Sequence, residues 1–177
     1  MLKLNQDVRL NRLTLEHATN MYRYMCDPVV RYNLGLRNEP SIEKTKTWII
    51  NSLSNPSISP FAVLLKNQHV GNVILDHIDN YLASARLSIY IGEPSARQSR
   101  VGSTAVYLAL SEGFKKMELH KVWLIVHSLN FAAMNTYIKL GFVTEGILRD
   151  EFILNGKRIN VFYMGLLRKD FDDILVQ

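Results

Sequence analysis

Two stretches of the chain carry residues whose types and spacing could do chemistry. In the first, residues 89–105, an apolar run ends near Gly92, a polar segment follows, and a run of small and apolar residues begins near Gly102. This order predicts a strand, a turn and the start of a helix. Free backbone N–H groups and the positive end of the helix dipole would converge at the turn, which suits a phosphate-bearing ligand.

The second stretch, residues 130–142, predicts a capped helix that presents a tyrosine. Asn130 stands where a helix N-cap belongs, and Gly141 stands where a left-handed C-terminal residue belongs. Tyr137 lies between them. A phenol with a pKa of about 10 stays protonated at neutral pH and can donate a proton. Tyr137 is therefore either a general acid or a tyrosine of the apolar core.

Together the two stretches resemble the GCN5-related N-acetyltransferase (GNAT) superfamily. The pattern R-x-x-x-x-G at residues 97–102 is similar to its acetyl-CoA loop, and N-x-x-A-x-x-x-Y-x-x-x-G-F at residues 130–142 is similar to its second motif. The chain is most similar to the branch of ribosomal-protein N-terminal, spermidine and nucleotide-amino-sugar acetyltransferases. The resemblance implies an α/β fold with a mixed, mostly antiparallel central sheet that is flanked by helices. It implies that this sheet is splayed between the strands at about 86–92 and 121–128.

The resemblance also implies which residues would bind acetyl-CoA. Main-chain N–H groups of the loop would hold the pyrophosphate, and Arg97 matches the leading basic residue of the motif. A backbone N–H at the end of the preceding strand would polarise the thioester carbonyl. Asn130 would bond the pantetheine arm, with simple helix capping as the alternative. The predicted cofactor-binding residues are Tyr90, Ile91, Gly92, Arg97, Gln98, Ser99, Arg100, Val101, Gly102, Ser103 and Asn130.

Arg100 departs from the family pattern, which has a glycine at this position. If the position requires a positive φ, a residue other than glycine strains the loop. Alternatively, the loop has a slightly different shape, and Arg100 adds a charge-assisted contact to a phosphate. We favour the second interpretation.

By the same resemblance, Tyr137 is the acid that protonates the departing thiolate, whereas the base is not evident. Several family members carry a glutamate five residues before the position of Asn130, and this chain has Ile125 there. His127 shares the predicted strand face of Ile125, so we interpret it as a catalytic base or water-relay partner. A purely structural histidine is the alternative.

The acceptor site is predicted more weakly. Tyr32, in a segment predicted to be irregular, and the pair Asp76 and His77, at a predicted strand end, are candidate acceptor contacts. The spacing of this His–Asp group does not predict a metal site. At pH 7, deprotonation costs about 4.6 kcal/mol for a lysine-like amine and about 1.1 kcal/mol for an α-amino group. Without a glutamate at position 125, the predicted order of acceptors is a protein N-terminus, a nucleotide-linked amino sugar, then a small amine or polyamine.

The remaining elements follow from periodicity and turn signals. The sequence predicts helices that begin after Thr14 and Ser41, and a helix from about residue 102 to 117. Asn155-Gly156 is the strongest hairpin signal. Other predicted strands span residues 9–13, 61–65, 70–75, 148–154 and 157–167. Alternating strands and helices predict a mixed α/β domain.

Length and composition set the remaining expectations. The 177 residues predict one N-acetyltransferase domain, 1–177. The net charge of +5 suits a phosphate-rich ligand and disfavours polycationic polyamines. The single cysteine, Cys26, excludes an intrachain disulfide and is expected in the core of the first helix. A chain with one cysteine and no apolar run of membrane-spanning length is predicted to be cytoplasmic.

The function predicted from the sequence is acetyl-CoA-dependent N-acetylation of a primary amine. The alternative is a non-catalytic acyl-CoA-binding or sensing module on the same fold. Nucleic-acid binding is disfavoured because no basic run with interleaved aromatic residues is present. The family resemblance also allows a homodimer.

Overall fold

A seven-stranded sheet organises the fold. The computed structural model describes the backbone of residues 3–97 and 99–176, and the side chains of these residues up to 172. The strands lie in the order β1-β2-β3-β4-β5-β7-β6. Every neighbouring pair is antiparallel except β4 and β5, which are parallel, and this confirms the predicted mixed sheet. The strands are β1 (Val8–Arg12), β2 (Ser59–Leu65), β3 (Gln68–Asp79), β4 (Ser84–Ile91), β5 (Lys121–His127), β6 (Val143–Leu154) and β7 (Lys157–Leu167).

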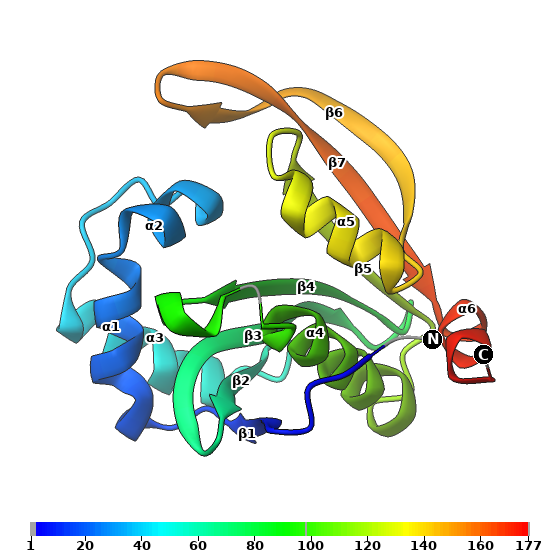
Figure 1. The fold of residues 1–177 in the computed structure, drawn as a ribbon, viewed down its shortest axis with the longest axis horizontal. Helices are drawn as coiled ribbons and strands as arrows, with labels where there is room; N and C mark the ends of the chain where they lie inside the picture. Colours follow the sequence, from blue (N-terminus) through cyan, green and yellow to red (C-terminus); the bar gives the residue numbers. More distant parts are fainter. Residues whose placement is uncertain (1–2, 98, 177) are drawn as a thin grey trace.

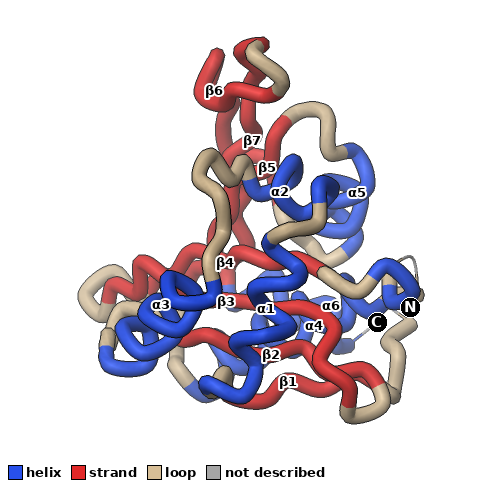
Figure 2. The backbone as a smooth tube through the Cα atoms, turned by 90° about the vertical axis from the view of Figure 1, so that its left-hand side faces the viewer, coloured by secondary structure: helices blue, strands red, loops and turns tan. Residues whose placement is uncertain are grey.

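The two parallel strands separate soon after they meet. Residues 84–86 of β4 pair with residues 121–123 of β5, and pairing stops there although β4 continues to Ile91 and β5 to His127. Figures 1 and 2 show β5, β7 and β6 rising away from the β1–β4 half of the sheet. The predicted splay between these strands is confirmed.

Helices cover both faces of the β1–β4 half. The α-helices of the described chain are α1 (Ala18–Met25), α2 (Pro28–Leu34), α3 (Ile42–Ser54), α4 (Val101–Ser111), α5 (Phe131–Lys139) and α6 (Arg168–Val176). Of these, α1 and α3 cover one face of the β1–β4 half and α4 covers the other, whereas α5 lies beside β5 and β7 (Figure 1). Ala62 and Leu64 pack in one core cluster with residues of α1 and α3, whereas Val63 packs in a second cluster with residues of α4. Successive strand residues point to opposite faces, so β2 is buried from both sides.

The predicted local signals form as expected at several element ends. The Ser41 hydroxyl accepts a hydrogen bond from the Lys44 N–H at 3.1 Å and caps α3. Asn155 and Gly156 have φ values of 50° and 75°, as a two-residue turn of type I′ requires. Gly141 has a φ of 86° just after α5. These positions are governed by local backbone chemistry, so neighbouring residues suffice to predict them.

Three sequence predictions are wrong or incomplete. The segment predicted to be irregular from residue 32 begins within α2, because Asp27 caps a helix that starts at Pro28. Strand β3 continues through residues 76–79, beyond the predicted strand end at residue 75. Cys26 is exposed at the end of α1 instead of buried.

Helix α6 was not predicted. It is held by Phe171, whose ring centroid lies 5.1 Å from that of Phe114. No helix among the described residues combines the length and the hydropathy needed to cross a lipid bilayer.

Candidate active site

A cavity of about 470 Å³ lies in the splay between β4 and β5, with α2, α4 and α5 contributing to its walls. It brings residues from distant parts of the chain to one place. Seven residues predicted for the site line it: Tyr90, Ile91, Arg97, Gly102, His127, Asn130 and Tyr137.

The N-terminus of α4 offers free donors at one wall of this cavity. The first backbone hydrogen bond at this end runs from the Thr104 N–H to the Arg100 carbonyl at 3.0 Å. The N–H groups of Val101, Gly102 and Ser103 have no acceptor among the described residues, and the Arg100 side chain does not cap the helix. These three N–H groups, without an acceptor in the described part of the chain, and the helix dipole form a site for an anion such as a phosphate.

Arg100 adopts the left-handed backbone conformation, with a φ of 62° and a ψ of 10°. The favoured interpretation, a loop of different shape, is therefore wrong. The chain keeps the positive φ that a glycine would adopt more easily, at a cost of about 1–2 kcal/mol. The exposed side chain of Arg100 remains available for a charged ligand.

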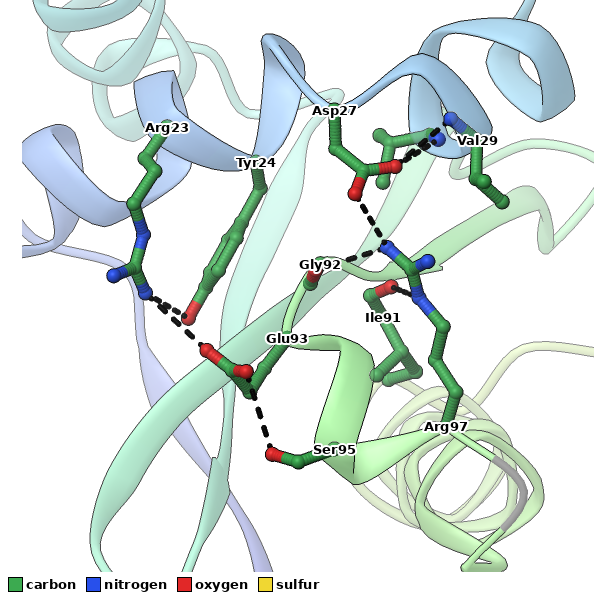
Figure 3. Close-up of polar contacts among 10 residues, drawn as sticks. Arg23, Tyr24, Asp27, Val29, Ile91, Gly92, Glu93, Ser95 and Arg97 are labelled. Atoms are coloured by element: carbon green, nitrogen blue, oxygen red, sulfur yellow. Dashed lines mark hydrogen bonds and ion pairs between the residues drawn. The ribbon is translucent and has the colours of Figure 1, made fainter.

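Arg97 does not extend toward a ligand as predicted (Figure 3). Its Nε donates to the Ile91 carbonyl at 3.1 Å and its Nη2 donates to the Gly92 carbonyl at 3.0 Å. Nη2 also lies 3.2 Å from Oδ2 of Asp27. The guanidinium is thus bound to the end of β4 and to the residue that caps α2, so its assignment as a phosphate contact is corrected to a positioning role.

Of the predicted strand-end residues 90–92, Ile91 is the one whose backbone N–H faces the cavity. The Gly92 N–H donates to the Val70 carbonyl at 2.8 Å, so it is not free for a ligand. A side chain at Gly92 would collide with the ring of Tyr24, which explains the glycine. Antiparallel strands direct alternate residues to opposite edges, so the Ile91 N–H points toward the splay.

The side chain of Tyr90 helps to hold the end of β4 against β3. Its hydroxyl donates to Oδ1 of Asn72 at 2.6 Å beneath the sheet surface, and burial raises its pKa. Its hydroxyl is therefore committed to the fold, and its backbone groups, like those of Gly92, face β3, so only its ring is left to contact a ligand.

Tyr137 lies on α5 with its ring against Phe142, at a centroid distance of 5.7 Å. It is buried, yet its hydroxyl has no hydrogen-bond partner in the described part of the chain, and it lines the cavity. Burial raises the pKa of Tyr137 to about 12. The hydroxyl is therefore a proton donor throughout the physiological pH range.

His127 lies in the cavity as a buried ring among aromatic neighbours. Its side chain is only 5% exposed, and neither ring nitrogen has a hydrogen-bond partner among residues 3–97 and 99–172. The rings of Tyr32 and Phe152 lie 5.8 and 5.5 Å away. Burial lowers the pKa of His127, so the ring is neutral at pH 7. Ile125 lines the same cavity, and the predicted shared face is confirmed.

Asn130 performs the capping role that was the alternative to ligand binding. Its Oδ1 accepts from the Ala133 N–H at 3.2 Å, and its Nδ2 donates to Oδ1 of Asn33 at 3.4 Å. The second contact joins α5 to α2 across the cavity. A contact to pantetheine stays a prediction.

The three residues predicted to contact the acceptor lie in two different places. Tyr32 lies on α2, not on a loop, and its ring contacts His127. Asp76 and His77 do not line the cavity: Asp76 accepts two hydrogen bonds from Arg86, both at 2.8 Å, and lies 2.9 Å from His77 Nδ1. The Asp76 carboxylate is therefore held by Arg86 within the sheet, and a contact of either residue with the acceptor stays a prediction.

Among the other predicted loop residues, the side chains of Ser99, Val101 and Ser103 are engaged within the protein. Gln98 lies outside the described residues. The Ser99 hydroxyl donates to the Ala96 carbonyl at 2.8 Å, and that of Ser103 donates to the Arg100 carbonyl at 3.1 Å. Val101 is fully buried. For Ser99, Val101 and Ser103, only the main chain is left for a ligand.

The sequence predictions missed two further features of the site: the helix start at Asp27 and the side chain of Phe152. The Asp27-Pro28 pair is a typical helix start and could have revealed α2 and its cap. Phe152, which lines the cavity from β6, carries no local signal that would distinguish it from any other strand residue.

Comparison with known proteins identifies the family of the chain. Residues 7–143 match the model of the family described as acetyltransferase (GNAT) domain. The spermidine N(1)-acetyltransferase of Escherichia coli K12 is 32% identical over 111 residues, which are 63% of this chain and 59% of that protein. The match therefore spans less than two thirds of this curated relative.

Two solved structures have the same fold. Spermidine N-acetyltransferase from Vibrio cholerae in complex with CoA and spermine superposes with a TM-score of 0.89 at 24% identity, covering 94% of this chain and 99% of that one. A dodecameric structure of the Vibrio cholerae enzyme in an intermediate state gives a TM-score of 0.81 at 24% identity, covering 94% and 97% of the two chains.

Proposed function

The chain belongs to the acetyltransferase (GNAT) domain family, and on this premise we propose that it transfers an acetyl group from acetyl-CoA to a primary amine. One observation carries the proposal: a single cavity joins three groups that have no partner among the described residues, namely the first N–H groups of α4, the edge of β4 at Ile91 and the hydroxyl of Tyr137. We propose equally that residues 1–177 form one N-acetyltransferase domain.

The cavity walls fit the chemical parts of acetyl-CoA. The N–H groups of residues 101–103 would hold the pyrophosphate, and Arg100 would add a positive charge at its exposed side. The β4 edge at Ile91 would hold the amide-rich pantetheine by strand-like hydrogen bonds, because no strand of the described chain occupies that edge. The net charge of +5 favours a ligand that carries several phosphates.

When bound, acetyl-CoA supplies the acetyl group as a thioester. The Ile91 N–H would stabilise the negative charge that develops on the carbonyl oxygen as the amine nitrogen forms its bond to the carbonyl carbon. His127 would accept the proton of the attacking amine at a ring nitrogen, and Tyr137 would donate its hydroxyl proton to the sulfur as the C–S bond breaks. Exchange with water restores both side chains.

The acceptor that we propose to test first is spermidine. The support is the name of the 32% identical relative, and nothing in the comparisons supports the protein N-terminus or the amino sugar that the sequence-based order placed first. The aromatic rings of Tyr32 and Phe152 would contact the alkyl-ammonium chain of the acceptor. The described cavity lining includes Arg86 and Arg97 and no carboxylate, so a simple monoamine is the second acceptor to compare.

We also propose that the chain assembles with copies of itself through β6. This strand is at the edge of the sheet, and Val143, Ile147 and Ile153 on it are 61%, 55% and 49% exposed. Exposed apolar residues on a long edge strand are typical of a surface that another chain covers. Light scattering should give a mass above 20.3 kDa for the wild type and a smaller particle for Ile147→Lys; a monomeric wild type would contradict this proposal.

The function is tested by calorimetry with acetyl-CoA and by thiol release with spermidine and a panel of amines. Gly102→Pro should abolish acetyl-CoA binding because it removes one free N–H and places a ring in the phosphate site. Gly146→Ala is the matched control, because a Cβ at Gly146 meets open space. Absence of binding by the wild type would refute the proposal, and binding without turnover of any amine would favour the acyl-CoA-sensing alternative.

A further inference from the structure

The ion pair of Asp27 and Arg97 joins the two sides of the cavity. We propose that this pair is a clasp that couples the cofactor loop to helix α2, so that cofactor binding at the loop orders α2 over the acceptor end of the cavity. The identity of the ligand rests on the proposed function. The two residues are positioning residues, since Asp27 does not line the cavity and Arg97 is held by protein groups.

The two carboxylate oxygens of Asp27 have different partners (Figure 3). Oδ1 accepts hydrogen bonds from the N–H groups of Val29 and Val30 at 2.8 and 3.0 Å, and so caps α2. Oδ2 lies 3.2 Å from Nη2 of Arg97. Burial raises the pKa of Asp27, but the hydrogen bonds from Val30 and Arg97 outweigh this effect and lower it. The carboxylate therefore stays ionised and holds both groups at neutral pH.

Arg97 connects this carboxylate to the first residues of the cofactor loop. The same guanidinium that pairs with Asp27 donates to the carbonyls of Ile91 and Gly92. The Ile91 carbonyl belongs to the strand edge that faces the splay. A planar guanidinium can serve three acceptors from one fixed position, whereas a lysine ammonium cannot reproduce this fork. The loop, the end of β4 and the start of α2 are thus held by one side chain.

The other end of α2 is attached to the opposite wall of the cavity. The ring of Tyr32 lies 5.8 Å from that of His127, and Asn33 accepts a hydrogen bond from Asn130 at 3.4 Å. Gly35, at the C-cap of α2, packs directly against the ring of Phe152, leaving no room for a side chain. Figures 1 and 2 show α2 opposite α5 and the β6–β7 hairpin. Helix α2 therefore spans the splay, with the clasp at one end and the candidate acceptor residues at the other.

The chain offers variants that separate coupling from simple stability. Asp27→Asn keeps an oxygen to cap α2 and removes the charge that binds Arg97, and asparagine is as good an N-cap as aspartate. Glu93→Gln is the matched control, because the neighbouring pair of Glu93 and Arg23 is 3.4 Å long and the Arg23 side chain is 61% exposed. Arg97→Lys keeps the positive charge, loses the fork, and serves if Asp27→Asn does not fold.

The experiment is hydrogen exchange of the full chain with and without coenzyme A, with calorimetry of coenzyme A binding. In the wild type and in Glu93→Gln, coenzyme A should slow exchange in α2 by at least about fivefold. In Asp27→Asn, this effect should fall below about twofold and coenzyme A should bind about fivefold more weakly. Protection at residues 101–104 should persist in all three proteins at saturating coenzyme A.

The outcomes distinguish the clasp from the proposed function. Coenzyme A binding with undiminished protection of α2 in Asp27→Asn would overturn the clasp and leave the acetyltransferase proposal intact, since α2 would then be ordered by direct contact alone. Binding to the wild type without any change in α2 would also overturn it. If the wild type does not bind coenzyme A, both proposals are refuted.

Discussion

Replacing Tyr137 by phenylalanine removes one hydroxyl and leaves the buried ring packed against Phe142. If the hydroxyl donates to the departing sulfur, the substitution removes a hydrogen bond to a group that becomes charged only as the reaction proceeds. Such a bond contributes about 1.5–3 kcal/mol, so kcat should fall by about 10- to 150-fold. The dissociation constant of acetyl-CoA should change by less than about twofold, because the interaction is made in the transition state.

The environment of Tyr137 also predicts the pH dependence of kcat. Burial raises the pKa of its hydroxyl to about 12. The acid form is lost only as the pH rises through this raised value, so at pH 9 roughly one molecule in a thousand lacks the proton. A tyrosine of ordinary pKa, about 10, would instead be half ionised at pH 10. The wild type should therefore show no alkaline loss of kcat attributable to Tyr137 up to about pH 10.5.

The assay is thiol release from acetyl-CoA at saturating amine, measured from pH 7 to 10.5 for the wild type and Tyr137→Phe. The two profiles should be parallel, with the variant lower throughout. Equal kcat values would refute the assignment of Tyr137 as the acid. A fall near pH 10 in the wild type that is missing from the variant would show that the cavity does not desolvate the hydroxyl.

Three further predictions follow from individual positions. His127→Phe keeps a ring between its aromatic neighbours but removes both nitrogens, so kcat/KM should fall by about 100-fold. In the wild type, kcat/KM should decline on the acid side below the ordinary histidine pKa of about 6.5, because burial lowers the pKa of His127. An unchanged pH profile of kcat/KM in the variant would exclude His127 as the base. Arg100→Gly should raise stability by about 1 kcal/mol, or Tm by roughly 2–4 °C, because glycine accepts a φ of 62° without strain; a lower Tm in calorimetry would contradict this. Phe171→Ala should lower the free energy of unfolding by about 3–5 kcal/mol in urea titrations, because the ring is 1% exposed; a loss below about 1 kcal/mol would show that α6 is dispensable.

The sequence by itself determined the features that depend on neighbouring residues. Asn130 and Ser41 were predicted to start helices, and both side chains cap them, because an N-cap needs only a short polar side chain next to free N–H groups. The Asn155-Gly156 turn and the left-handed Gly141 follow from backbone sterics in the same way. The two motifs at residues 97–102 and 130–142, in order and at the right separation, were also sufficient to predict the family and, by resemblance, its splayed sheet.

Tertiary structure alone decided what the charged and titratable side chains do. Arg97 has the same sequence neighbours whether it binds a phosphate or the backbone, and only folding brings Asp27, 70 positions earlier in the chain, within 3.2 Å of it. Asp76 was a plausible acceptor contact until β4 placed Arg86 beside it. His127 is buried in a cavity, with no hydrogen-bond partner among the described residues, because Tyr32 of α2 and Phe152 of β6 lie against its ring. Capping and turn preferences act over a few residues, whereas ion pairing and desolvation depend on distances in space that no local pattern encodes.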